Sequence, residues 1–237
     1  MDLAVLDNPI WHALANEHNK FSLGGDNAKR YPADVAPFAA LKAGFPGAFN
    51  ELAATLDVGQ PVALFTDVAP VLPSGWRVVR QRPIDQMICT LAADSERFQP
   101  VRLTVADVDE MITLAKLTEP GPFAEQTIAM GAFFGVRSAE GQLIAMAGTR
   151  LALPQFTEIS AVCTHPDHTG KGFARDLVAF LTKRILSGGR IPFLHVKGEN
   201  RAARVYERVG FTHRASLILS VIANTGSDLH NESHEQG

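Results

Sequence analysis

The chain has 237 residues, which leaves room for one large domain or two small ones. Hydrophobic residues make up 46% and charged residues 20%, a balance that excludes a disordered chain, a collagen and a coiled coil. The net charge is −3, two cysteines cannot build a disulfide framework, and no secretory signal or membrane-spanning apolar stretch is visible. We therefore expect a soluble cytoplasmic protein that binds neither nucleic acid nor membrane; its oligomeric state stays open, a dimer included.

The first hundred residues are divided into short elements by recurring Pro and Gly. Apolar spacing predicts a helix over 46–56, and two β-like runs follow over 61–66 and 75–80. No constellation of reactive side chains is visible in this region. A polar segment that ends in proline, 92–100, marks a seam in the chain. We therefore predict three parts: an N-terminal accessory domain (1–98), a second domain (99–225) and a polar tail (226–237).

Beyond this polar segment the sequence predicts the secondary structure more clearly. Thr104 and Asp107 resemble a capping box, which predicts a helix through Leu117, and a loop with two prolines follows over 118–123. The remaining predicted elements are a strand over 101–103, a short helix over 124–130, a hairpin over 133–137 and 143–151, a strand over 156–164, a long helix, a strand over 191–197, a helix over 201–209 and a last strand over 215–222. This order predicts an α/β fold with a mixed sheet.

The most informative segment is 158–186, where a strand turns through a glycine-rich loop into an amphipathic helix. A Cβ at Gly170 or Gly172 would block close approach of a phosphate. The unpaired N–H groups and the dipole at the helix start form an anion site suited to a pyrophosphate, to which Lys171 can add charge. The loop matches neither the P-loop nor the dinucleotide-binding fingerprint. The alternative is a tight strand–helix turn with no ligand.

A second constellation follows the strand predicted over 191–197. Asn200 suits the N-cap of a short helix, and Gly210 suits the left-handed position just past its end. Tyr206 lies on the apolar face of that helix. A purely packing role would leave its hydroxyl in need of a partner.

Together these segments resemble the GCN5-related N-acetyltransferase (GNAT) superfamily, in particular its FR47-like branch, over roughly 101–222. The first family signature is Gln/Arg-x-x-Gly-x-Gly/Ala at a helix start, and 169–174 matches its Gly and Ala positions. The second is Asn-x-x-Ala and Tyr-x-x-x-Gly-Phe, matched by Asn200, Ala203, Tyr206, Gly210 and Phe211. The chain departs from the pattern at Thr169, where Gln or Arg is usual, and at Asn200, which stands six rather than seven residues before Tyr206.

The resemblance implies an α+β fold, with a GNAT-type mixed and mostly antiparallel sheet flanked by helices. The fourth and fifth strands, 156–164 and 191–197 here, would splay apart around acetyl-CoA, the implied co-substrate; no metal is implied. The N-terminal accessory domain is then an addition to this fold or a degenerate second GNAT half. The implied cofactor-binding residues are Val162, Cys163, Thr164, Thr169, Gly170, Lys171, Gly172, Phe173, Ala174, Arg175, Asn200, Ala203 and Tyr206.

The implied reaction is direct attack of a primary amine on the thioester. Glu158 is the expected base, since a carboxylate on an otherwise apolar strand is costly unless it is used or paired, and Tyr206 is the expected acid for the leaving thiolate. An amide near Val162 or Cys163 would stabilise the oxyanion. Glu119 and Phe123 are expected on the acceptor side. His195 can touch the acceptor or satisfy a core hydrogen bond, and we favour the latter.

We expect a small amine or amino acid as the acceptor. The alternatives are a protein N-acetyltransferase, which acts on an α-amine or a lysine, and a non-catalytic module that binds or senses acyl-CoA. Cys163 is read as a buried small residue rather than a nucleophile, because no base stands near it in sequence. His165 and His168 lack the ligand spacing of a metal site.

Overall fold

The computed structural model describes residues 2–91, 99–197 and 202–226. The helices in this part are η1 (Ala4–Leu6), α1 (Pro9–Ala15), η2 (Asn19–Phe21), α2 (Ala48–Ala53), η3 (Val105–Asp107), α3 (Val108–Thr118), η4 (Thr127–Met130), η5 (Pro166–His168), α4 (Phe173–Ser187) and α5 (Ala202–Val209), where η marks a 3-10 helix. The strands are β1 (Leu23–Gly24), β2 (Ala28–Arg30), β3 (Ala39–Leu41), β4 (Pro61–Thr66), β5 (Trp76–Ile88), β6 (Val101–Leu103), β7 (Phe133–Arg137), β8 (Leu143–Ala152), β9 (Phe156–Thr164), β10 (Ile191–Lys197) and β11 (Thr212–Asn224).

The elements predicted for the second part of the chain are confirmed, with small differences at their ends. The capping box forms, because Thr104 N donates to Asp107 Oδ2 at 2.7 Å and Ala106 N donates to Thr104 Oγ1 at 3.3 Å. The short helix expected over 124–130 is the 3-10 helix η4. The strand expected over 75–80 continues as β5 to Ile88, past Pro83.

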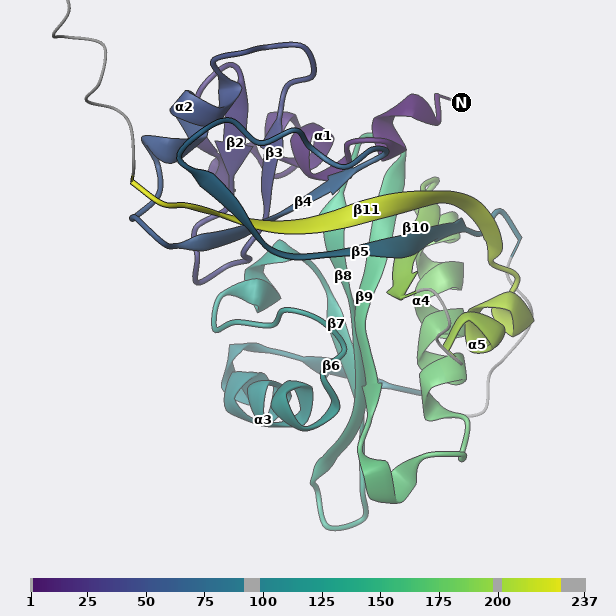
Figure 1. Cartoon of the computed structure of the whole chain (residues 1–237). Coiled ribbons are helices and arrows are strands. Elements are labelled where there is room, and N and C mark those ends of the chain that lie inside the picture. The colour runs from purple at the N-terminus through teal and green to yellow at the C-terminus, as the bar shows by residue number, and fades with distance from the viewer. Residues whose placement is uncertain (1, 92–98, 198–201, 227–237) are drawn as a thin grey trace, which may run out of the picture.

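An eight-stranded sheet forms the centre of the molecule, in the order β4-β11-β5-β10-β9-β8-β7-β6 (Figure 1). Its strand pairs are antiparallel, except that β10 runs parallel to β9. A separate three-stranded sheet, β1-β2-β3, lies beside β4. The predicted mixed, mostly antiparallel sheet flanked by helices is thus confirmed.

Strand β5 lies between β10 and β11, although it comes from the first hundred residues. Pro83 stands one residue before the pairing with β10 begins at Ile84, a position where a strand tolerates a missing N–H. The boundary predicted at residue 98 therefore falls between strands of one sheet. The division into an accessory and a catalytic domain stays a prediction, and the tail beyond residue 226 lies outside the described residues.

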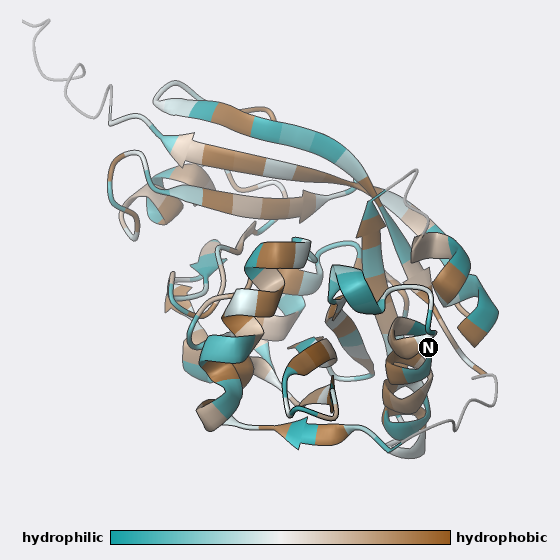
Figure 2. Ribbon diagram, turned by 90° about the horizontal axis from the view of Figure 1, so that it is seen from below, coloured by the Kyte–Doolittle hydropathy of each residue, from teal (hydrophilic) through white to brown (hydrophobic). Residues whose placement is uncertain are grey.

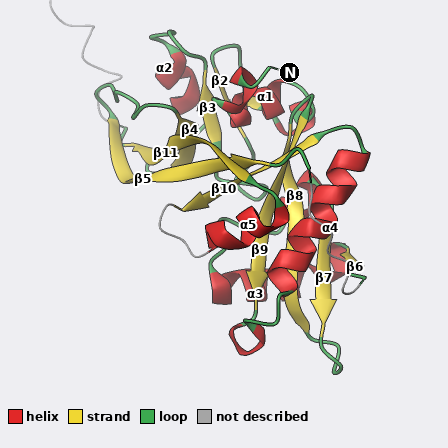
Figure 3. Ribbon diagram, turned by 90° about the vertical axis from the view of Figure 1, so that its right-hand side faces the viewer, coloured by secondary structure: helices red, strands yellow, loops and turns green. Residues whose placement is uncertain are grey.

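Helices cover both faces of the sheet. Helices α4 and α5 lie on one side of β8 and β9, and α3 lies on the other (Figures 1 and 3). Hydrophilic and hydrophobic residues alternate along the helices, so that each buries an apolar stripe (Figure 2). No helix in the described part is long and apolar enough to cross a membrane.

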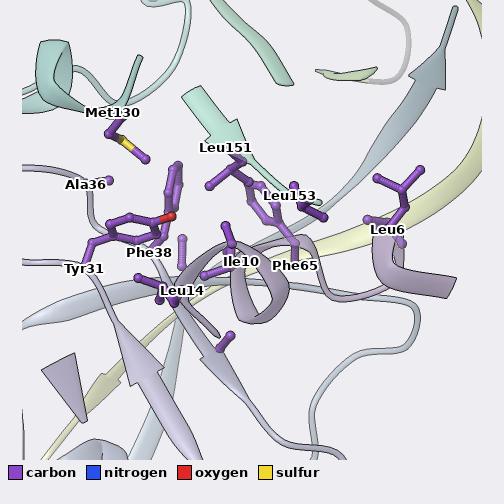
Figure 4. Close-up of a cluster of buried hydrophobic side chains, with 14 of the residues drawn as sticks. Leu6, Ile10, Leu14, Tyr31, Ala36, Phe38, Phe65, Met130, Leu151 and Leu153 are labelled. Carbon is purple, nitrogen blue, oxygen red and sulfur yellow. The ribbon is translucent and has the colours of Figure 1, made fainter. Parts of the chain in front are cut away.

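The N-terminal segment is joined to the sheet by a hydrophobic cluster of its own (Figure 4). Leu6, Ile10 and Leu14 are fully buried there against side chains from the sheet, among them Leu151 and Phe65. Burying a side chain of this size contributes about 1.5–3 kcal/mol. The segment 6–14 therefore contributes to the main core.

Candidate active site

Strands β9 and β10 pair with each other over only part of their length and then diverge. Among the described residues they pair over three positions only, of which the last joins Phe193 to Glu158. Beyond this divergence point, β9 runs on to Thr164 and β10 to Lys197 in different directions (Figure 3). Two strand edges that diverge leave main-chain donors and acceptors for an extended ligand to pair with. The predicted splaying of these strands is confirmed.

A β-bulge interrupts β9 just after the divergence point. Gly148 faces Ser160 and Met146 faces Cys163, so Ala161 and Val162 together oppose the single residue between. Ala161 has φ +53°, a left-handed conformation that costs a non-glycine residue about 1–2 kcal/mol. Such strain is typical of functional sites, where it turns a backbone group out of the ladder.

The loop before α4 has the backbone of an anion site. Gly170 and Gly172 have φ of +76° and +88°, and nothing lies within 4 Å of the position that a Cβ on Gly170 would take. Gly172 is the N-cap of α4 and offers no side-chain cap, and the start of a helix leaves its first N–H groups without intrahelical carbonyl partners. The loop thus fits a phosphate group.

The side chains of this loop are mostly engaged with one another. Thr169 Oγ1 donates to Pro166 O at 2.9 Å, and Lys171 Nζ lies 3.3 Å from His168 Nδ1. Arg175 forms an ion pair with the buried Asp176, with Nη2 2.8 Å from Oδ1. An anion at this loop would therefore depend chiefly on backbone N–H groups.

Tyr206 on α5 and Cys163 on β9 are both buried. Burial, and then the proximity of Cys163, raise the pKa of Tyr206 to about 12, so that the hydroxyl keeps its proton at neutral pH. Burial also raises the pKa of the Cys163 thiol to about 11, which makes it a poor nucleophile. The Tyr206 ring packs against Phe211 at 6.2 Å between centroids.

Thr164, at the end of β9, is a candidate ligand-binding residue. Its Oγ1 is buried and has no hydrogen-bond partner within the described residues. Buried hydroxyl groups nearly always form a hydrogen bond. The Thr164 hydroxyl at the diverging edge of β9 is therefore a good candidate to bond to a polar group of a ligand. Val162 lies on the α4–α5 side of β9, while Ala161 and Cys163 lie on the α3 side.

Glu158, the expected base, is buried at the divergence point and fully engaged. Arg150 on β8 donates to both of its oxygens, Nε to Oε2 at 2.8 Å and Nη2 to Oε1 at 2.7 Å, and His195 Nδ1 lies 2.7 Å from Oε1. Burial opposes ionisation, but Arg150 and His195 outweigh it and lower the pKa to about 2. A carboxylate of that pKa is a weak proton acceptor, so this geometry does not favour the base role.

The other expected residues are spread around these features. Glu119 ends α3 in the left-handed conformation (φ +47°) and is exposed, whereas Phe123 is half-buried with its ring edge-on to Phe133 at 5.5 Å. Thr118, just before them, lies within hydrogen-bond reach of the Cys163 thiol. Ala203 packs into the core beneath α5. Asn200 lies outside the described residues.

Sequence reasoning missed two residues that contact this site, Arg150 and Gln86. Arg150 interrupts an apolar strand, which was a signal that an acidic partner must be buried beside it. Gln86 is fully buried in β5 and lies beside His195, whose predicted core hydrogen bond is confirmed. No group of three or more His, Cys, Asp or Glu within the described ranges is placed to hold a metal.

A divergent strand pair, a bulge in one of its strands and a glycine-rich loop at a helix start are the features that the resemblance to the GNAT superfamily implies. The FR47-like protein family model matches residues 134–218. A solved structure from Novosphingobium aromaticivorans, assigned to the GNAT family of acetyltransferases, is 35% identical, covers 92% of this chain and 98% of its own, and superposes with a TM-score of 0.85. This chain therefore belongs to the GNAT family.

A GCN5-related N-acetyltransferase from Kribbella flavida shares the fold at 18% identity, with a TM-score of 0.62 over 92% of this chain and 95% of its own. No curated protein matches the chain. The GNAT fold supports acyl-CoA-dependent transfer of an acetyl group to nitrogen, with acetyl-CoA as the co-substrate.

Proposed function

We propose that this protein transfers an acetyl group from acetyl-CoA to the primary amine of a small molecule or amino acid, by direct attack of the amine. The observation that carries the proposal is the divergence of β9 from β10, with a left-handed bulge just beyond it. The diverging edge can pair with the amides of a pantetheine arm, and the bulge can turn an N–H toward its thioester carbonyl.

We assign cofactor binding to two groups of residues. Along β9, the main chain of Val162, Cys163 and Thr164 would pair with pantetheine, and the unpartnered Thr164 hydroxyl supports a ligand there. At the start of α4, the backbone of the segment 169–175 would hold the pyrophosphate. Two glycines with positive φ support this role, because they bring N–H groups to the surface of the loop without a Cβ to exclude the anion.

We assign Tyr206 as the acid that protonates the leaving thiolate. Two properties support this role: the side chain is buried, and it retains its proton at neutral pH. General acids typically contribute about 10²–10⁴-fold to the rate. The low end is expected here, because a thiolate is a fairly good leaving group.

We assign Glu158 as a fixed negative charge at the divergence point rather than as a strong base. An amine with a pKa near 10.4 is mostly protonated at neutral pH and must lose a proton before it attacks. Both oxygens of Glu158 are already bonded to Arg150, His195 or Leu151 N, so we assign the removal of that proton to water rather than to Glu158. We place Glu119 and Phe123 on the acceptor side, because Thr118 next to them reaches Cys163.

The experiment is a coenzyme A-release assay with acetyl-CoA and a panel of amines, amino acids and peptides. Turnover with small amines or amino acids supports the proposal, and turnover with peptides only would instead indicate a protein N-acetyltransferase. Reactions without the acceptor and without the enzyme measure the background hydrolysis of the thioester. Tight binding of acetyl-CoA by calorimetry without any turnover would indicate a non-catalytic acyl-CoA sensor and overturn the proposal.

A further inference from the structure

Four side chains from four strands form a continuous hydrogen-bonded relay at the divergence point. In order they are Arg214 on β11, Gln86 on β5, His195 on β10 and Glu158 on β9. Arg214 Nη1 donates to Gln86 Oε1 at 3.0 Å, Gln86 Nε2 lies 3.0 Å from His195 Nε2, and His195 Nδ1 lies 2.7 Å from Glu158 Oε1. The strands place these residues together, since Gln86 is directly opposite His195 in the β5–β10 register.

The orientation of the Gln86 amide is determined at both ends. Its Nε2 donates to the carbonyl of Leu6 at 3.0 Å, and its Oε1 accepts from Arg214. Exchange of the two amide atoms would set oxygen against the Leu6 carbonyl and N–H against the guanidinium. Both contacts would then be repulsive, so Gln86 presents an N–H to His195.

The protonation of His195 follows from that N–H. Because Gln86 donates to it, His195 Nε2 must be the acceptor, and the ring proton sits on Nδ1, where it is donated to Glu158. A second ring proton on Nε2 would point at the Gln86 N–H. The relay thus favours a neutral imidazole of defined tautomer and an ionised Glu158.

The charged and titratable groups around His195 are consistent with this state. Arg150 balances Glu158, and Arg214 is paired with Asp7 at 2.6 Å. Burial lowers the pKa of His18 to about 4 and raises the pKa of Tyr31 well above its usual range, so that both are neutral at physiological pH. The His195 ring itself packs on Phe65, with 4.8 Å between centroids.

We propose that Arg214 and Gln86 are positioning residues for acetyl transfer, which hold His195 neutral with its proton on Nδ1 and so keep Glu158 anionic beside the reacting groups. The kinetic part of this inference rests on the proposed function; the protonation state does not. The N-terminal turn takes part, because Leu3 O and Leu6 O accept from Arg214 and Gln86, respectively.

The test is the Gln86→Glu variant of the full-length chain, followed by ¹⁵N NMR of the histidine rings. A carboxylate at this position has no N–H to donate, so it favours a second proton on His195 Nε2. In the wild type at neutral pH we expect one protonated and one unprotonated ring nitrogen on His195, and in the variant two protonated nitrogens. The His195→Gln variant assigns the signal.

The matched control is Gln81→Glu, which makes the same chemical change on the same strand. Gln81 donates to Ser220 at 2.9 Å instead of to the relay. The kcat for acetyl transfer should fall in Gln86→Glu by up to about a hundredfold, with a new ionisation in its pH profile, and stay near wild type in the control. If the Gln86→Glu variant does not fold, Gln86→Leu replaces it in the test, because leucine lacks both the N–H donor and the carbonyl acceptor of the glutamine amide.

Two results would overturn the inference. One is a wild-type His195 that is doubly protonated at neutral pH or protonated on Nε2 alone. The other is an active enzyme whose kcat and pH profile are the same in wild type, Gln86→Glu and Gln86→Leu. An inactive wild type would instead overturn the proposed function and the kinetic part, while the ring-nitrogen spectrum would still decide the protonation state.

Discussion

Arg150 and Glu158, eight residues apart on neighbouring strands, form a two-bonded ion pair that is almost wholly removed from water. The pair lies at the point where β9 and β10 diverge, since Glu158 is in the last paired position of the two strands. Taking both charges out of water is costly, and the contacts to His195 and to Leu151 N help to compensate for it. Removal of either partner would leave the other charge buried and unpaired.

We therefore expect Glu158→Gln and Arg150→Met each to lower the free energy of unfolding by about 3–5 kcal/mol, and the double variant to lose less than the sum. Urea unfolding of the four proteins measures this coupling. Glu110→Gln is the control, because its pair with Arg137 is partly exposed and contributes at most about 1 kcal/mol. If the losses of the two single variants simply add up to the loss of the double variant, the two charges do not stabilise each other.

Acid should destabilise the protein in two steps. His18 is neutral in the folded state down to about pH 4, whereas in the unfolded chain it is protonated below about 6.5, so stability falls between these values. Glu158 ionises with a pKa near 2 when folded and 4.5 when unfolded; its contribution is complete above 4.5 and is lost as pH falls toward 2. Denaturant titrations from pH 7 to 2 measure both, and His18→Gln should reduce the first step, to which His12 also contributes because burial lowers its pKa, and leave the second unchanged.

Gly172→Ala should weaken acetyl-CoA binding by about tenfold or more, since a lost hydrogen bond to a charged group is worth about 1.5–3 kcal/mol. Gly59→Ala is the control. Gly59 has a comparable φ of +82°, in the turn between α2 and β4, and nothing lies within 4 Å of the position that its Cβ would take, so the substitution carries similar backbone strain in the N-terminal part of the chain. Calorimetric titration compares the two. If both variants bind acetyl-CoA with the same affinity, this loop does not bind the pyrophosphate.

Tyr206→Phe should lower kcat by about tenfold to a hundredfold while leaving the KM for acetyl-CoA almost unchanged, because only the acidic hydroxyl is lost. Since its pKa is near 12, Tyr206 should produce no ionisation in the pH–rate profile below about pH 11. Tyr31→Phe is the control, because it removes the other tyrosine hydroxyl, which bonds to His18. If the single-turnover rate is the same in Tyr206→Phe and wild type, Tyr206 is not the general acid and contributes only to packing.

Glu119→Ala and Phe123→Ala should raise the KM for the acceptor and spare that for acetyl-CoA. Glu119 can attract an ammonium group, and Phe123 presents its ring at the other end of the same loop. Glu119→Gly separates charge from backbone, because glycine relieves the strain at φ +47° while it removes the same carboxylate. If both Glu119 variants leave acceptor kinetics unchanged, the loop is only a connector between α3 and η4.

Local chemistry determined much of the second part of the chain. Apolar periodicity and capping residues such as Thr104 specify elements through contacts within a few residues, so β9, α4 and the hairpin of β7 and β8 were predictable. The glycine-rich turn at 169–172 was also visible in the sequence, and glycine permits the positive φ that Gly170 and Gly172 adopt. The GNAT signatures could be read because they are short and contiguous.

Tertiary structure alone decided how β5 and the relay are arranged. Nothing in the local sequence of β5 states that it enters the sheet between β10 and β11, because strand partners are chosen by long-range pairing. The same pairing brings Gln86 to His195 and Arg150 to Glu158, and these neighbours lower the pKa of Glu158. The protonation of a buried group depends on all the charges and donors around it, and those come together only when the chain has folded.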